Sequence, residues 1–208
     1  MGWAVRLLKA TMGTEKKVIL IIGKRGSGKS YLAKQMIRDH RRLLVYDIMS
    51  EYTEGVVFGS EKHSEFCTFW LMVHKRDFRL IYRPVQPKPE IEEIAKAVFA
   101  LGDMTFVVEE IDSICTSYDL PEPFSWLIAR GRHRNITLIG VTPAPFGIHR
   151  DLTRQAKDIY VFSTNEPRDR IYLRGLLGQE IDSLLDALEP YQYVRWQDGV
   201  EGLEIGKA

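Results

Sequence analysis

The strongest constraint on the fold is a glycine-rich loop that directly follows an apolar run. Residues 18–22, VILII, are all apolar and mostly β-branched, which predicts a β-strand buried on both faces. The loop 23–30, GKRGSGKS, comes next, and an amphipathic helix is predicted from Gly28 to about Asp39. A buried strand, a glycine-rich loop and a helix in this order predict the first unit of an α/β fold.

The rest of the chain alternates short apolar runs with longer amphipathic ones. Further strands are predicted at 43–47, 78–84, 105–109, 136–142 and 158–163, with an edge strand at YQYVRW (191–196). Helices are predicted at 90–101, 121–130, 166–176 and 178–188, and a loop with a short helix within 50–77. Strands separated by helix-length segments predict a mostly parallel sheet with helices on both faces.

The loop 23–30 fits the pattern G-x-x-x-x-G-K-[S/T], the Walker A motif or P-loop, which cradles the phosphates of a nucleoside triphosphate. Its glycines let successive backbone N–H groups point at phosphate oxygens. We expect Lys29 to reach the β- and γ-phosphates and Ser30 to ligate Mg²⁺. The expected nucleotide-binding residues are Gly23, Lys24, Arg25, Gly26, Ser27, Gly28, Lys29, Ser30 and Tyr31. The flanking strand and helix argue against a chance glycine-rich turn.

Two adjacent carboxylates, Glu109 and Glu110, end a predicted buried strand, as a Walker B motif does. Ligands bind at the carboxyl ends of strands in open parallel sheets. Most ATPases have Asp-Glu here; we expect Glu109 to act on Mg²⁺ through a bound water and Glu110 to be the base that polarises the attacking water. Asp112 is either a third carboxylate or a turn cap. The strand predicted at 78–84, between the two motifs, is typical of the ASCE division of P-loop ATPases.

Composition limits the other classes of function. The formal net charge is +1, so any contact with nucleic acid must come from a local patch. Cys67 and Cys115 are too few for a disulfide scaffold, and His63 near Cys67 has no second ligand pair for zinc. No membrane span or signal peptide is recognisable, so we expect a cytoplasmic protein, in a host cell or associated with a virion if the chain is viral.

Four segments together resemble the FtsK/HerA superfamily of ring-forming, DNA-pumping ATPases. They are IIGKRGSGKS, then LLVYDIMSEY with Asp47, Glu51 and Tyr52 at the family's Asp and Glu-Tyr positions, then TFVVEEID, and finally ARGRHRNITLIGVTPAP. The resemblance covers roughly residues 16–175. It implies a RecA-like α/β domain that uses ATP and Mg²⁺, with Asp47 and Glu51 as further site residues.

The chain length of 208 residues leaves no room for the extra domains of HerA or FtsK. Minimal versions of the fold are the genome-packaging ATPases of membrane-containing icosahedral viruses, including the turreted ones. The resemblance therefore implies one domain over 1–208, with 1–15 as an N-terminal extension and about 178–208 as a C-terminal helix and edge strand. It also implies a homo-oligomeric ring, a hexamer or pentamer, that couples ATP hydrolysis to translocation of double-stranded DNA, with a viral capsid or membrane vertex as partner.

Three alternatives stay open. One is a cellular HerA-like DNA translocase or helicase. Another is a phage assembly ATPase of the zonula-occludens-toxin type, although that family normally carries a membrane segment. The third is a nucleotide-dependent interaction module without motor activity.

The resemblance also assigns roles around the fifth predicted strand. Ring ATPases of this kind bring an arginine to the γ-phosphate of the neighbouring subunit, and the candidates here are Arg132, then Arg130. Solvated loop charges are the favoured interpretation of Arg134 and His133. The family usually has Thr-Gln-x-Pro after this strand, whereas here Thr142 is followed by Pro143, so either Thr142 senses the phosphate or the coupling lies elsewhere.

Candidate contacts with DNA are basic side chains outside these motifs. Arg150, Arg154 and Lys157 share one face at helical spacing, and Lys75 and Arg76 are a second pair. A solvated helix face explains the first group at least as well.

Overall fold

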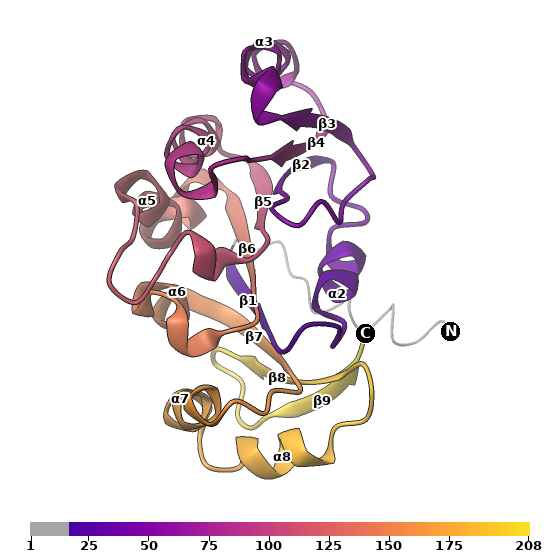
Figure 1. Ribbon diagram of the computed structural model, residues 1–208, viewed down its shortest axis with the longest axis vertical. Helices are drawn as coiled ribbons and strands as arrows, with labels where there is room; N and C mark the ends of the chain where they lie inside the picture. Colours follow the sequence, from indigo (N-terminus) through magenta and orange to yellow (C-terminus); the bar gives the residue numbers. More distant parts are fainter. Residues whose placement is uncertain (1–16) are drawn as a thin grey trace.

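A computed structural model describes residues 17–208, which fold around a nine-stranded sheet (Figure 1). The strand order is β3-β4-β2-β5-β6-β1-β7-β8-β9. The sheet is parallel from β3 to β7, and β8 and β9 are added antiparallel. The strands are β1 (Val18–Ile22), β2 (Arg42–Tyr46), β3 (Val56–Gly59), β4 (Phe78–Arg83), β5 (Met104–Val108), β6 (Ile136–Thr142), β7 (Ala156–Phe162), β8 (Gln192–Gln197) and β9 (Glu204–Lys207).

Helices cover both faces of this sheet. They are α2 (Lys29–Met36), α3 (His63–Val73), α4 (Pro87–Leu101), α5 (Glu122–Arg130), α6 (Arg150–Gln155), α7 (Pro167–Leu177) and α8 (Ile181–Ala187). In Figure 1, α4, α5 and α6 lie along one side of the central strands and α2 lies on the other. A hydrophobic core lies on each face of the sheet, and alternate residues of β1 point into one or the other. Leu20 faces the side of α4 and α5, whereas Ile19 and Ile21 pack with α2. The predicted fold class, α/β with a mostly parallel sheet, is confirmed.

The structure corrects three expectations about elements. YQYVRW is not an edge strand, because β8 pairs with β7 on one side and with β9 on the other. The helix predicted within 50–77 is present as α3, but the stretch also contains the parallel edge strand β3, which was not predicted; Val56 and Val57 are exposed, so no buried pattern marks it. Helix α6 ends at Gln155, and Lys157 belongs to β7, where it pairs with Asp198 and shares no helix face with Arg150.

Two further expectations concern the ends and the membrane. The predicted N-terminal extension, 1–15, lies outside the described residues. Among the helices of residues 17–208, none combines the length and the apolar character needed to cross a membrane.

Candidate nucleotide-binding site

The P-loop, residues 23–30, joins the end of β1 to the start of α2 and is fastened to the neighbouring strands. The Gly23 N–H donates to the carbonyl oxygen of Thr142 at 3.2 Å, and the Lys24 N–H donates to that of Ser163 at 3.0 Å. A Cβ atom at Gly23 would lie 2.6 Å from Cβ of Phe162, so only glycine fits there. Gly26 and Gly28 have φ of +76° and +110°, in the region that favours glycine. The loop conformation therefore depends on these glycines.

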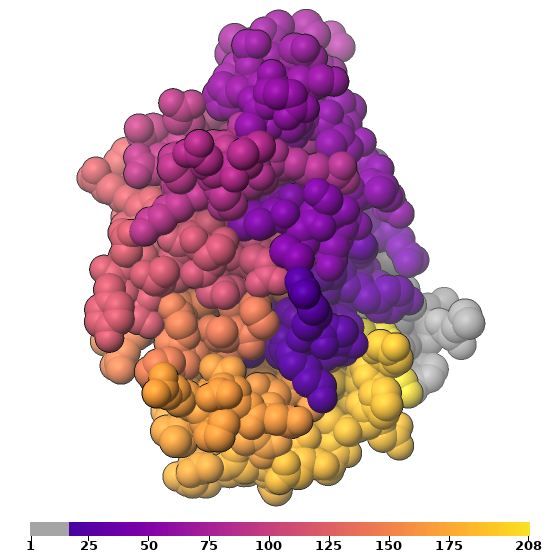
Figure 2. Space-filling view, viewed as in Figure 1, coloured from indigo at the N-terminus to yellow at the C-terminus, as the bar shows by residue number. Residues whose placement is uncertain are grey.

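The P-loop opens onto a cavity of about 490 Å³. Its lining comes from segments that follow β1, β2, β5 and β6 and from the turn before β8: Arg25, Gly26, Gly28, Lys29, Ser30, Tyr31, Met49, Glu51, Glu109, Glu110, Pro143 and Tyr191. Six of the nine predicted nucleotide-binding residues are in this lining, whereas Gly23, Lys24 and Ser27 do not line the cavity. In Figure 2 the indigo surface of the loop and α2 borders the yellow surface of the C-terminal residues.

Two polar side chains of the P-loop are poorly satisfied by the protein itself. Lys29 is 9% exposed, and burial lowers the pKa of its ammonium group against the opposing effect of Glu110 and Glu109. Its Nζ donates to the carbonyl oxygen of Lys24 at 3.1 Å. The Ser27 Oγ is buried and has no hydrogen-bond partner among residues 17–208. Phosphate oxygens would supply acceptors to both groups, so the loop fits an anion.

Glu109 and Glu110 reach the cavity from the end of β5 in different environments. Glu109 is 3% exposed, and its Oε1 accepts the hydroxyl of Tyr52 at 2.5 Å. Burial raises the pKa of Glu109 to about 7, although the Tyr52 hydrogen bond opposes the shift. Glu110 is half-buried with a left-handed φ of +48°, and burial together with nearby Asp112 raises the pKa of its carboxyl group. The chain thus leaves the strand at Glu110, and both carboxylates line one cavity.

Asp47 positions the loop after β2 and does not line the cavity itself. It is fully buried, and its two carboxylate oxygens accept the N–H groups of Glu51 at 2.9 Å and Tyr52 at 3.1 Å. Arg83 donates to Asp47 at 3.3 Å and to the carbonyl oxygen of Tyr52 at 2.8 Å. This arrangement brings Glu51 into the cavity lining and the Tyr52 ring to Glu109. Sequence reasoning missed Arg83, whose place at the end of β4 carries no local motif.

The oxygen atoms around the cavity fit Mg²⁺ bound together with a phosphate. Ser30, Glu51, Glu109 and Glu110 all line it, and Mg²⁺ prefers hydroxyl and carboxylate oxygens. No group of three or more His, Cys, Asp or Glu side chains within residues 17–208 is arranged to hold a metal ion alone. Mg²⁺ usually relies on one or two carboxylates plus water and phosphate oxygens, so this donor set matches its ordinary behaviour.

Thr142 does not line the cavity. Its buried hydroxyl donates to Asp112 Oδ1 at 2.8 Å and accepts the Ala144 N–H at 3.1 Å. Asp112 is therefore tied to the end of β6, beside the base candidate Glu110, whose pKa it raises. Pro143 is the residue of this turn that lines the cavity.

Arg130 and Arg132 lie near the amino ends of the parallel strands, whereas the P-loop lies at their carboxyl ends. Arg130 ends α5, with its guanidinium 5.6 Å from the ring centre of Phe99. Arg132 precedes β6 and lines a small cavity with Val18, the first residue of β1, whereas the P-loop follows the last residue of that strand. Arg134 donates to the last carbonyl groups of α4, at Phe99 and Ala100. The arginine candidates and the P-loop of one chain are thus not brought together.

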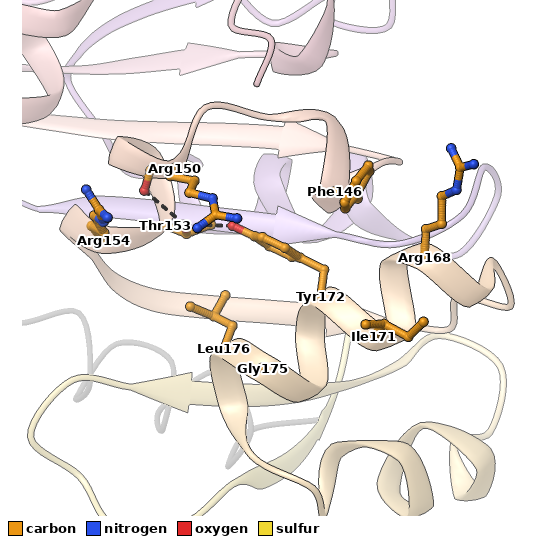
Figure 3. A pocket seen from close by; sticks show the side chains of 9 residues that line it. All are labelled: Phe146, Arg150, Thr153, Arg154, Arg168, Ile171, Tyr172, Gly175 and Leu176. Carbon is orange, nitrogen blue, oxygen red and sulfur yellow. Dashed lines mark hydrogen bonds between the residues drawn. The ribbon is translucent and has the colours of Figure 1, made fainter. Parts of the chain in front are cut away.

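A second cavity, of about 550 Å³, lies between α6, α7 and the turn after β6 (Figure 3). We call it the arginine groove; it is lined by Phe146, Arg150, Thr153, Arg154, Arg168, Ile171, Tyr172, Gly175 and Leu176. Arg154 pairs with Asp151 at 3.8 Å, but within residues 17–208 the side chains of Arg150 and Arg168 form no ion pair. Thr153 and Tyr172 share a hydrogen bond of 2.9 Å in its floor. The groove combines free positive charge with aromatic surface.

Comparison with known proteins relates the chain to a set of solved structures. No protein-family model matches it, and no curated protein matches its sequence. The genome packaging NTPase B204 from Sulfolobus turreted icosahedral virus 2, in complex with ATP-gammaS, matches with a TM-score of 0.76 and 18% identity over 94% of this chain and 98% of that one. VirB4 of Thermoanaerobacter pseudethanolicus matches at 0.62 and 12%, over 91% and 88%.

The N-terminal domain of zonular occludens toxin from Neisseria meningitidis also matches, with a TM-score of 0.55 and 12% identity over 93% of this chain and 94% of that one. At these identities the likeness concerns the fold. The chain has the fold of the packaging NTPase B204 over nearly its whole length, which confirms the resemblance drawn from the sequence at the level of the fold.

Proposed function

We propose that this protein is an ATPase that works as a homo-oligomeric ring and translocates double-stranded DNA during viral genome packaging. The observation that carries the proposal is the cavity that gathers Lys29 and Ser30 of the P-loop with Glu109 and Glu110. The fold shared with B204 supports packaging as the process, because the two chains cover one another almost completely.

The P-loop binds the triphosphate in this proposal. Its inward N–H groups and the amino end of α2, whose first turn carries no acidic residue, attract the phosphate oxygens. Lys29 exchanges its bond to the Lys24 carbonyl group for one to a phosphate. Ser30 directly, and Glu109 through water, would hold Mg²⁺, which neutralises charge on the phosphates when bound.

Glu110 acts as the base. Its carboxylate accepts a proton from the water that attacks the γ-phosphate, and its raised pKa makes it a stronger base than a solvated carboxylate. Positive charge on Lys29 and Arg25 keeps it ionised for this step. Glu109, held by Tyr52, stays in place beside it.

The arginine groove is the candidate surface for DNA. The net charge of +1 supplies no general attraction to a polyanion, whereas Arg150 and Arg168 offer local charge that no acidic side chain of residues 17–208 pairs with. The turn 143–146 joins the two sites, because Pro143 lines the nucleotide cavity and Phe146 lines the groove. DNA bound at the groove is therefore placed to affect hydrolysis.

A DNA-stimulated ATPase assay tests the proposal. Double-stranded DNA should raise the ATPase rate of the assembled protein, and the double variant Arg150→Ala, Arg168→Ala should lose at least about tenfold in DNA affinity and with it the stimulation at low DNA concentration, while basal hydrolysis persists. Arg41→Ala, at an exposed arginine that pairs weakly with Asp77 at 3.6 Å, is the matched control and should respond like the wild type. A rate that double-stranded DNA leaves unchanged in the assembled protein would contradict the translocase function.

A further inference from the structure

Tyr191 occupies a backbone conformation that does not suit it. The carbonyl oxygen of Glu189 accepts the Gln192 N–H at 3.0 Å, so Pro190 and Tyr191 are the central residues of a tight turn. Tyr191 has a φ of +65°, and a type II turn requires a positive φ at this second central position, where glycine or asparagine is usual. A bulky residue at positive φ is strained, and such strain is commonly retained for a function.

The strained turn places the Tyr191 ring beside the P-loop. A Cβ atom at Gly28 would lie 3.3 Å from Cδ1 of Tyr191, and the residue lines the same cavity as Lys29 and Ser30. The strand pair β8–β9 holds the turn, because the Ala208 N–H donates to the Tyr191 carbonyl group at 3.0 Å. The residue is nevertheless 57% exposed, and no other aromatic ring within residues 17–208 stacks on it. The ring is therefore accessible to a ligand.

The strand order defines which part of a nucleotide reaches this ring. Glu109 and Glu110 follow β5, two strands to one side of β1, whereas Tyr191 precedes β8, two strands to the other side. The P-loop follows β1, between them. A triphosphate whose γ-phosphate points toward the glutamates therefore directs its other end toward Tyr191.

We propose that Tyr191 is the stacking platform for the purine base of the bound nucleotide. This assignment rests on the proposed nucleotide binding at the P-loop. The glutamates, Lys29 and Ser30 suit the phosphate end, while the Tyr191 ring provides flat apolar surface of the kind on which bases stack. The cavity of about 490 Å³ lies in the size range of small-molecule sites. A base contact also explains why a strained tyrosine stands where glycine would relax the turn.

The test separates contact with the base from support of the loop. Tyr191→Gly removes the ring and suits the positive φ, so the melting temperature should stay equal to or above that of the wild type. Its affinity for the non-hydrolysable ATP analogue AMPPNP, measured by calorimetry with Mg²⁺, should fall by about tenfold to a hundredfold. Its affinity for inorganic tripolyphosphate should stay within about twofold of the wild type, because that ligand has no base. Tyr191→Phe should bind AMPPNP like the wild type.

Tyr118→Gly is the matched control, since Tyr118 is almost fully exposed and lines neither cavity, and it should bind both ligands like the wild type. Unchanged AMPPNP binding by Tyr191→Gly overturns the assignment, and so does an equal loss for AMPPNP and tripolyphosphate, which would mean that the ring only shapes the loop. If the wild type binds neither ligand and Lys29→Ala changes nothing, the proposed nucleotide function itself fails, and the assignment with it.

Discussion

At the scale of single residues, the burial of Glu109 makes the stability of the ligand-free protein depend on pH. The pKa of this carboxyl group rises from 4.5 to about 7 in the fold. Between these two pH values the folded state keeps a proton that the unfolded state has lost. The stability associated with protonated Glu109 is therefore fully present below pH 4.5 and is lost as pH rises through about 7. We expect Glu109→Gln, which still accepts the Tyr52 hydroxyl, to stabilise the protein by roughly 1–3 kcal/mol at pH 8 and by little at pH 4.5.

Urea unfolding in EDTA at the two pH values measures this difference. Glu92→Gln, at an exposed glutamate of α4, is the matched control and should change stability equally little at both. A gain for Glu109→Gln that is the same at pH 4.5 and pH 8 would mean that Glu109 ionises in the fold without a penalty.

At the scale of elements, Asp47 connects the loop after β2 to Glu109 at the end of β5. It accepts two backbone N–H groups and the Arg83 guanidinium, and through Tyr52 it supports Glu109. Asp47→Ala leaves these donors without an acceptor, so we expect a loss of roughly 2–3 kcal/mol in unfolding free energy, together with a fall in kcat that exceeds the change in KM.

Asp77→Ala is the control for that variant. Asp77 is exposed and pairs only weakly with Arg41, so its removal should cost less than about 0.5 kcal/mol and leave kcat unchanged. Comparable effects of the two substitutions, in denaturant titrations and steady-state assays, would show that the loop does not depend on Asp47.

At the scale of the whole molecule, Arg132 lies far from the P-loop of its own chain, so in the proposed ring it would meet the nucleotide of a neighbouring subunit. Arg132→Ala and Glu110→Gln should each lower kcat by at least about a hundredfold. Mixed rings should regain part of the activity, because a Glu110→Gln subunit can present its intact Arg132 to the active site of an Arg132→Ala neighbour. The measurement is ATPase rate against mixing ratio.

Arg134→Ala is the comparison variant for the mixing experiment. Arg134 donates to the end of α4, so its loss should affect stability and give no recovery that depends on the mixing ratio. Absence of recovery for Arg132→Ala while assembly is intact would remove this residue from the trans role and leave Arg130 as the remaining candidate.

Motifs that are formed by consecutive residues were predictable from the sequence. The run from β1 through the P-loop into α2 is contiguous, and the two glutamates that follow an apolar strand predict a place at the carboxyl ends of the parallel strands, where ligands bind. The short strands β3 and β9 were missed because both carry exposed residues and no buried pattern.

The sequence by itself determined the α/β class, the phosphate loop and the two carboxylates, because each depends on local spacing and on the burial of the strand beside it. Only the tertiary structure decided which distant segments meet. The strand arrangement brings Tyr191 to the P-loop and Arg83 to Asp47, and it places Arg132 at the amino ends of the strands, away from the P-loop. Contacts of this kind depend on the order of the strands in the sheet, and the spacing of motifs along the sequence does not determine that order.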